Sequence, residues 1–150
     1  MSEEVVMHDY KFCTRYDHNG KIQKDENRLG VLEALILQMR LSRKTKRFLL
    51  IMHEKTANRF KENLEDDLTA VLEIADPSGD IQVQYELDDG KFEGASSHPR
   101  CIFSIKGGLQ FDQGFQVFKS NEANLVKWMS KEALLPFQKK FIPIFHSFDR

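Results

Sequence analysis

The stretch KDENRLGVLEALILQMRLSRKTKRFLLIMH, residues 24–53, carries the clearest secondary-structure signal in the chain. Polar and acidic residues at 24–27 are typical of a helix N-terminus, and apolar residues then recur at helical spacing from Leu29 to Leu41. Because these apolar residues occupy most of the circumference, we expect a central helix that is covered on more than one side. The apolar run that follows, residues 46–53, predicts a buried strand.

Upstream of this helix, the alternation of side chains over residues 5–16 predicts one long strand. It ends at residues 17–20, where the pair Asn19-Gly20 tolerates positive φ and suits a tight hairpin turn. Residues 21–23 are therefore expected to begin a short return strand.

Downstream, Thr56 is the expected cap of a helix in which Leu64 and Leu68 fall at helical spacing. Four carboxylates late in this helix oppose its macrodipole, so we expect it to end near Asp66. The pattern then changes to a period of two. The strands that it predicts form an antiparallel meander over residues 69–75, 81–87, 101–106, 109–111 and 115–118.

The carboxyl-terminal part predicts a last helix and an aromatic tail. Ser120 or Asn121 caps the helix, Trp128 lies on its apolar stripe, and Pro136 restarts or ends it. The expected fold is α+β: a single domain over residues 1–150, with an antiparallel sheet of about five to six strands packed against the central helix. Residues 137–150 form the Phe-rich tail.

Composition excludes several classes of protein. The 22 Lys and Arg against 23 Asp and Glu give a net charge of −1, so no global field attracts nucleic acid or an anionic membrane. No apolar run approaches the roughly twenty residues of a membrane span, and the first residues are acidic, unlike a secretory signal. We expect a soluble, cytoplasmic protein. Cys13 and Cys101 form no CxxC pattern, which favours neither a disulfide framework nor a zinc site.

Motifs of catalysis and metal binding are absent from the sequence. No two of the five histidines lie three or four residues apart, and there is no HExxH, GxSxG, Walker A or GxGxxG pattern. We therefore predict no catalytic residues, metal or cofactor. The alternative is a small enzyme whose site is not visible as a motif, with His53 and Glu54 meeting a carboxylate from a turn.

Five cations occur within eight positions, from Arg40 to Arg47, with no acid among them. One interpretation is that they complement the carboxyl end of the central helix. Another is anion binding, because several guanidinium and ammonium groups can hold a phosphate. A nucleotide-like ligand would then be bound by residues of this run and of a later turn. These residues are Arg43, Lys44, Arg47, Asp76 and Ser78.

The segment Arg43 to Arg47 resembles the RxxxR element of PilZ domains, which bind cyclic diguanylate, and Asp76-Pro77-Ser78 is similar to the start of that family's (D/N)x(S/A)xxG element. The glycine of the second element falls at Ile81 in this chain, so we assign no family. The resemblance implies a strand barrel and a cyclic dinucleotide ligand.

Eight of the twelve phenylalanines lie between Phe103 and Phe148. One interpretation is that the tail folds back and completes the core. The other, which we favour for function, is an apolar patch for a protein partner or for self-association. The anchoring residues would be Phe141, Ile144, Phe145 and Phe148, with Arg43, Lys44 and Arg47 steering an acidic surface. The expected function is non-catalytic binding or regulation.

Overall fold

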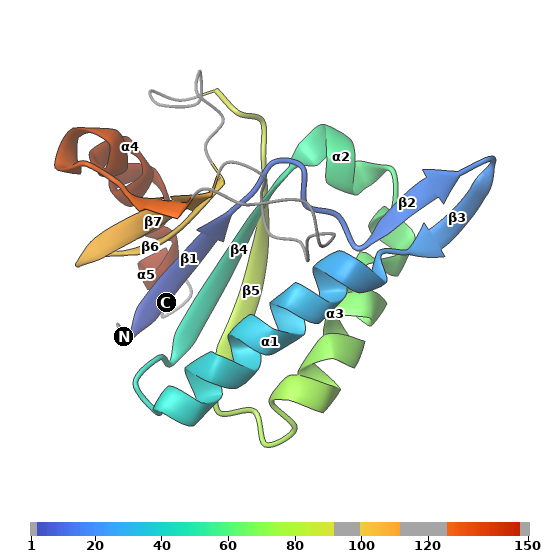
Figure 1. Ribbon diagram of the computed structural model, residues 1–150, viewed down its shortest axis with the longest axis horizontal. Coiled ribbons are helices and arrows are strands. Elements are labelled where there is room, and N and C mark those ends of the chain that lie inside the picture. The colour runs from blue at the N-terminus through green and yellow to red at the C-terminus, as the bar shows by residue number, and fades with distance from the viewer. Residues whose placement is uncertain (1–2, 92–99, 112–125, 148–150) are drawn as a thin grey trace.

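A computed structural model describes residues 3–91, 100–111 and 126–147, which form a six-stranded sheet with helices on both faces (Figure 1). The spatial order of the strands is β5-β4-β1-β6-β7-β8. Their bounds are β1 Glu4–His8, β4 Arg47–His53, β5 Gln82–Asp88, β6 Arg100–Ser104, β7 Gly107–Phe111 and β8 Val126–Trp128. The predicted α+β class and number of strands are confirmed. The strand expected at 115–118 lies outside the described residues.

The sheet is mixed, which corrects the expectation of an antiparallel meander. β1 pairs with β4 and β4 with β5 in parallel, whereas β1–β6, β6–β7 and β7–β8 pair antiparallel. Parallel neighbours need a crossover connection, and the helices α1 (Glu26–Ser42) and α3 (Lys61–Ala75) supply the two crossovers. Both lie on the same face of the sheet (Figure 1). The described strands form an open sheet, so the barrel implied by the PilZ resemblance is wrong.

Helix α1 begins as the sequence predicts but is buried on one side. The carboxylate of Asp25 accepts a hydrogen bond from the backbone N–H of Arg28 at 3.0 Å, which caps the helix. The buried side chains form one stripe, Leu29, Leu32, Ile36 and Met39. Leu41 is exposed. The helix therefore covers a face of the sheet rather than occupying the centre of the molecule.

Helix α3 runs through the region where a strand was expected at 69–75. Its buried residues are Leu64, Asp67, Leu68, Val71 and Ala75, which lie on one helical face. The acids at residues 62–67 do not end it, because α3 begins only at Lys61 and they lie in its first half, away from the carboxyl end where they would oppose the macrodipole. Asp67 also accepts hydrogen bonds from Arg15 at 2.8 and 3.0 Å. A short helix, α2 (Glu54–Asn58), precedes α3.

The strand predicted over residues 5–16 is divided in two. Asp9 forms a turn after β1, in which its carboxylate accepts a hydrogen bond from the N–H of Lys11 at 2.9 Å. The chain then enters a hairpin of β2 (Arg15–His18) and β3 (Lys21–Lys24). Its turn has φ of 52° at Asn19 and 80° at Gly20, as the Asn-Gly pair predicts.

The carboxyl-terminal helix begins later than expected. Residues 126–128 form β8, so Trp128 lies on a strand and not on a helix. The helix is α4 (Lys131–Phe141), capped by Ser130, and it continues through Pro136. The short helix α5 (Ile144–Ser147) follows. The expected caps Ser120 and Asn121 lie outside the described residues.

Both faces of the central strands are covered. Odd and even positions of β1 point to opposite faces: Val5 and Met7 join the core beneath α1 and α3, whereas Val6 joins the core beneath α4. The second core contains three rings of the predicted tail, Phe137, Phe141 and Phe145, each 1% exposed. Among the described residues, no helix has the length and apolar character needed to cross a membrane.

Candidate functional site

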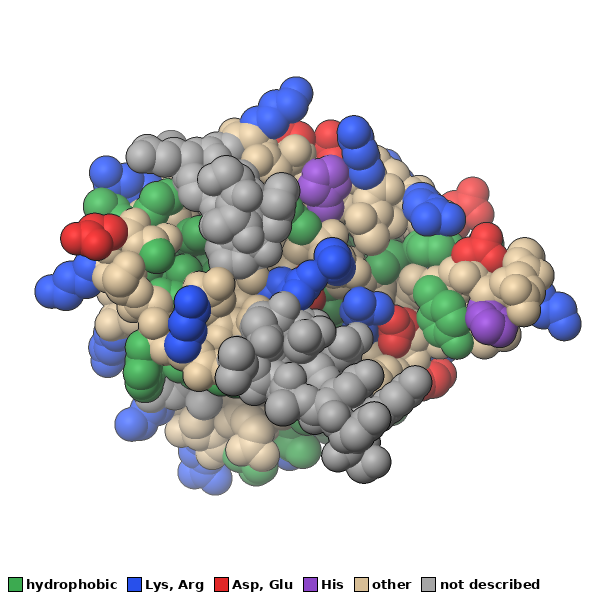
Figure 2. Space-filling model, turned by 45° about the horizontal axis from the view of Figure 1, so that its top comes forward, with side chains coloured by type: hydrophobic (Ala, Val, Ile, Leu, Met, Phe, Trp, Pro, Cys, Tyr) green, Lys and Arg blue, Asp and Glu red, His purple; other side chains and the backbone are tan. Residues whose placement is uncertain are grey.

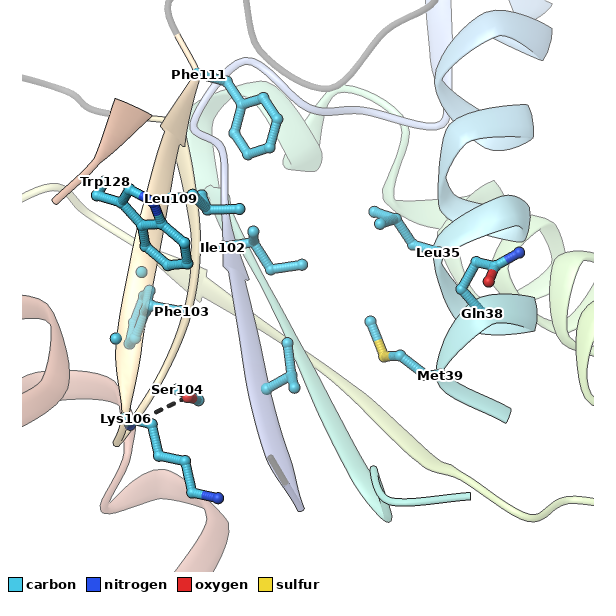
Figure 3. A pocket seen from close by; sticks show the side chains of 13 residues that line it. Leu35, Gln38, Met39, Ile102, Phe103, Ser104, Lys106, Leu109, Phe111 and Trp128 are labelled. Carbon is cyan, nitrogen blue, oxygen red and sulfur yellow. Dashed lines mark hydrogen bonds between the residues drawn. The ribbon is translucent and has the colours of Figure 1, made fainter. Parts of the chain in front are cut away.

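An apolar groove lies where the covering helices of one face end. α1 and α3 cover the parallel half of the sheet, but β6, β7 and β8 extend beyond α1 (Figure 1). The resulting hollow has a volume of about 520 Å³. Figure 3 shows Leu35 and Met39 pointing from α1 toward the sheet, and Ile102 and Leu109 pointing from the strands toward α1.

Strand register explains the floor of this groove. Met7 pairs with Ile102, Ile102 with Leu109, and Leu109 with Trp128, so these four side chains form one row across β1, β6, β7 and β8. Met7 is fully buried beneath the helices, whereas Trp128 is 77% exposed. The apolar row thus continues past the part of the sheet that α1 and α3 cover.

One end of the groove is polar. Lys106 lines it there with Ser104, whose hydroxyl accepts a hydrogen bond from the backbone N–H of Lys106 at 3.1 Å (Figure 3). The groove is therefore apolar along its length with a cation at one end. The sequence does not reveal this groove, because its pattern predicts Trp128 on a helix and the facing residues of α1 in an enclosed core.

A second hollow brings together part of the predicted anion site. Arg43 and Ser78 line it from the α1–β4 and α3–β5 connections, with Arg40 and Lys46, which the sequence prediction had not included in the site. Asp76 does not line it; its carboxylate accepts hydrogen bonds from the backbone N–H groups of Asp80 and Ile81.

The remaining two residues of that prediction are placed elsewhere. Arg47 forms an ion pair with Glu4 at 3.1 Å and donates a hydrogen bond to the backbone carbonyl of Phe145 at 3.2 Å. Lys44 is exposed and does not line the hollow. Two of the five predicted residues therefore lie together at one hollow.

The enzyme alternative required His53 to meet a carboxylate from a turn, and a related cluster is present. His53 and Asp88 are the last residues of two neighbouring parallel strands, β4 and β5. Tyr10 lies between them: its ring contacts that of His53 edge-on at 5.2 Å, and its hydroxyl donates a hydrogen bond to Asp88. Lys140 of α4 forms an ion pair with the same carboxylate at 2.7 Å. No interaction joins Glu54 to this cluster in the described structure.

The electrostatics of the cluster favour anchoring over catalysis. Burial would raise the pKa of Asp88, but hydrogen bonds from Lys140, Tyr10 and the Gly90 N–H outweigh it and hold this pKa below its usual value. Burial and the bond to Asp88 raise the pKa of Tyr10. Both oxygens of Asp88 are already engaged, so this carboxylate holds α4 against the sheet edge and is a poor general base.

The residues expected to anchor a partner are mostly enclosed. Phe141 and Phe145 lie in the core beneath α4, and Ile144 packs against it. For these residues, the structure supports the interpretation that the tail completes the core. The expectation of an exposed patch at Phe141 and Phe145 is wrong. Phe148 lies outside the described residues.

Neither cysteine is placed to react. Cys13 and Cys101 are buried and unpaired with each other, and burial raises the pKa of both thiols. Within the described ranges, no three His, Cys, Asp or Glu side chains gather to hold a metal ion.

No protein-family model and no curated protein matches the chain. The functional proposal therefore rests on the geometry of these sites.

Proposed function

We propose that this protein is a non-catalytic binding protein, and that the apolar groove between α1 and strands β6 to β8 receives the apolar face of a helix from a protein partner. The observation that carries this proposal is the 77% exposure of Trp128 at the end of an apolar row. Tryptophan is enriched among the residues that dominate binding energy at protein interfaces.

The shape of the groove favours a helix over a small molecule. Sites for small ligands enclose most of the ligand surface, whereas this groove is bounded by α1 on one side and by the exposed Trp128 on the other. An amphipathic helix fits such a surface, because its apolar side chains at i, i+3, i+4 and i+7 can enter the groove while its polar face stays in water.

The charge at the groove indicates which charge the partner helix carries there. Lys106 at one end attracts an acidic residue at the matching end of the helix. Elsewhere, basic side chains are spread around the face shown in Figure 2 rather than gathered into one patch. Steering by Arg43, Lys44 and Arg47 is reduced to the first two, since Arg47 is paired with Glu4.

Selection from a phage-displayed peptide library tests the proposal. Peptides selected on the native protein, after depletion on Trp128→Ala, are expected to share apolar residues at helical spacing and an acidic residue near one end. Ile74→Ala is the matched control, because Ile74 is a similarly exposed apolar residue on α3, outside the groove. The enriched peptides should bind Ile74→Ala as they bind the native protein.

Other results would overturn the proposal. A parallel selection without depletion that yields only peptides binding native protein and Trp128→Ala equally would place recognition elsewhere. A native protein that light scattering shows to be a stable dimer, and Trp128→Ala a monomer, would assign the groove to self-association instead. Binding of decanoate but of no peptide would indicate a small-molecule site.

A further inference from the structure

A polar hollow lies at the amino-terminal ends of β4 and β5, the opposite end of these strands from the His53–Asp88 cluster, and is separate from the apolar groove. It lies between the connection from α1 to β4 and the connection from α3 to β5, which run side by side at the bottom of Figure 1. Its volume is about 630 Å³, within the range of small-molecule sites. Buried Thr45 and Ile81 form part of its wall.

Three cations line this hollow without ion pairs. Within the described part of the chain, Arg40, Arg43 and Lys46 form no salt bridge, although the next residue, Arg47, is paired with Glu4. Their first effect is to offset the negative end of α1, which carries about half an elementary charge. Three cations exceed that requirement, so the hollow keeps the capacity to bind an anion.

The backbone at Arg43 is a second, independent observation. Arg43 is the carboxyl-terminal cap of α1 and has φ of 57° and ψ of 9°, the left-handed conformation in which glycine is the usual residue. Its N–H donates to the carbonyl of Arg40 at 3.1 Å. An arginine here costs about 1 kcal/mol relative to glycine. Such local strain is retained at ligand sites when the side chain is needed there.

The opposite wall is preorganised and carries groups that can bind hydroxyls. The carboxylate of Asp76 fixes the α3–β5 turn through the N–H groups of Asp80 and Ile81 at 3.0 and 2.9 Å. In that turn the hydroxyl of Ser78 donates to the carboxylate of Asp80 at 3.2 Å. Asp80 keeps acceptor capacity for a ligand hydroxyl or amine, which a site for inorganic phosphate alone would not need.

From these contacts we infer that the hollow is a binding site for a small phosphate ester that also carries hydroxyl groups, such as a nucleotide or a sugar phosphate. Arg43 and Lys46, with Arg40, bind the phosphate. Asp80 and Ser78 bind the hydroxyls. The exposed Leu41 offers an apolar surface to the rest of the ligand. This site is separate from the groove and does not depend on the function proposed for it.

Ligand-detected NMR with adenosine monophosphate, adenosine and pyrophosphate tests the site, because it detects even millimolar binding. Adenosine monophosphate is expected to bind more tightly than pyrophosphate, and adenosine is expected not to bind. Arg43→Gly should weaken binding of adenosine monophosphate roughly tenfold. The same substitution should leave the melting temperature of the ligand-free protein unchanged or higher, because glycine relieves the backbone strain.

Lys46→Ala and Lys44→Ala form a matched pair of variants. Each removes one exposed lysine from the same connection, but Lys46 lines the hollow and Lys44 does not. Weaker binding of adenosine monophosphate by Lys46→Ala, with unchanged binding by Lys44→Ala, supports the site. Equal binding in native protein, Lys46→Ala and Arg43→Gly would overturn it, as would no binding of either phosphate compound. Binding of an oligonucleotide or an acidic peptide but not of adenosine monophosphate would also overturn it.

Discussion

The carboxylate of Asp67 is 2% exposed and ties α3 to the hairpin that precedes α1. Arg15 donates two hydrogen bonds to it, and the ammonium group of Lys24 lies 4.0 Å away. Burial would raise the pKa of Asp67, but these bonds and the charge of Arg15 outweigh burial and lower it. A carboxyl whose pKa is lowered by folding stabilises the folded state while it is ionised.

Asp67→Asn is therefore expected to lower the free energy of unfolding at neutral pH by roughly 2 to 3 kcal/mol. This loss is smaller than that from breaking a fully buried ion pair, because the Arg15 side chain is 21% exposed. The difference between native and variant proteins should shrink as the pH falls below about 4, the ordinary pKa of an unfolded Asp. Urea unfolding from pH 7 to pH 3 measures it.

Asp66→Asn is the control for that experiment, since Asp66 is the adjacent acid and is exposed. It should change stability by less than about 0.5 kcal/mol at either pH. A loss that is the same at pH 7 and pH 3 in Asp67→Asn would contradict a contribution from its ionised form.

The two thiols give a second prediction at the scale of single residues. Cys13 and Cys101 are 5% and 0% exposed, and burial raises the pKa of both, so little thiolate is present or accessible at neutral pH. Ellman's reagent should react with neither cysteine in the native protein and with both in guanidinium chloride. Rapid modification of a thiol in the native state would contradict the packing around it.

Residues that act through their neighbours in sequence could be predicted. The cap at the start of α1 and the turn at Asn19-Gly20 depend on bonds within a few residues, and both were expected. The pairing of Arg15 with Asp67 could not be predicted, because the two lie 52 residues apart and meet through the fold. The acids of α3 do not end the helix because it begins at Lys61, which places them in its first half.

At the scale of elements, the packing of α4 on β7 depends on a glycine. A Cβ atom at Gly108 would lie 2.9 Å from the Cβ of Phe103 and 3.1 Å from Cδ1 of Leu134 and Sδ of Met129. Gly108→Ala should therefore destabilise the protein by about 1 to 3 kcal/mol in thermal or urea unfolding. The neighbouring Gly107→Ala, whose Cβ would meet nothing within 4 Å, should not share this steric loss. Equal stability of the two variants would contradict the close approach of α4.

The aromatic tail gives another prediction at this scale. Removal of residues 137–150 deletes Phe137, Phe141 and Phe145, each worth about 1.5 to 3 kcal/mol of burial. Their sum approaches the whole stability of a typical domain, so the truncated chain should not fold. Circular dichroism melting of the truncated chain measures this. A cooperative transition would show that the tail is dispensable for folding and would contradict its place in the core.

Local pattern predicted some elements and misassigned others. The sequence predicts the helix α1 and the strand β4 from long apolar patterns, and the strand β5 from an alternation of period two. The acids before residues 69–75 suggest a helix end and so predict a strand there, whereas burial of Leu68, Val71 and Ala75 extends α3 to Ala75. Three residues of β8 are too few for periodicity to distinguish a strand from a helix.

For the whole molecule, the class of fold was predictable and the directions of the strands were not. Apolar runs such as Phe48 to Met52 are typical of strands buried on both faces, but direction is set by which strands pair, and that information is not local. The sites likewise divide into one that the sequence predicts in part and one that depends on how the strands pair. Arg43 and Ser78 were expected together from their chemistry, whereas the groove depends on register between β6, β7 and β8.

The groove is the central feature of the functional proposal, and the chain carries its own reporter there, since Trp128 is the single tryptophan. The most direct measurement is its fluorescence, with acrylamide quenching, during titration with a peptide selected on the native protein. Acrylamide should strongly quench the fluorescence of Trp128 in the free protein. Binding of the peptide should shift the emission to shorter wavelength and reduce the quenching by acrylamide. A peptide that binds by fluorescence anisotropy while Trp128 stays equally accessible would contradict the proposal.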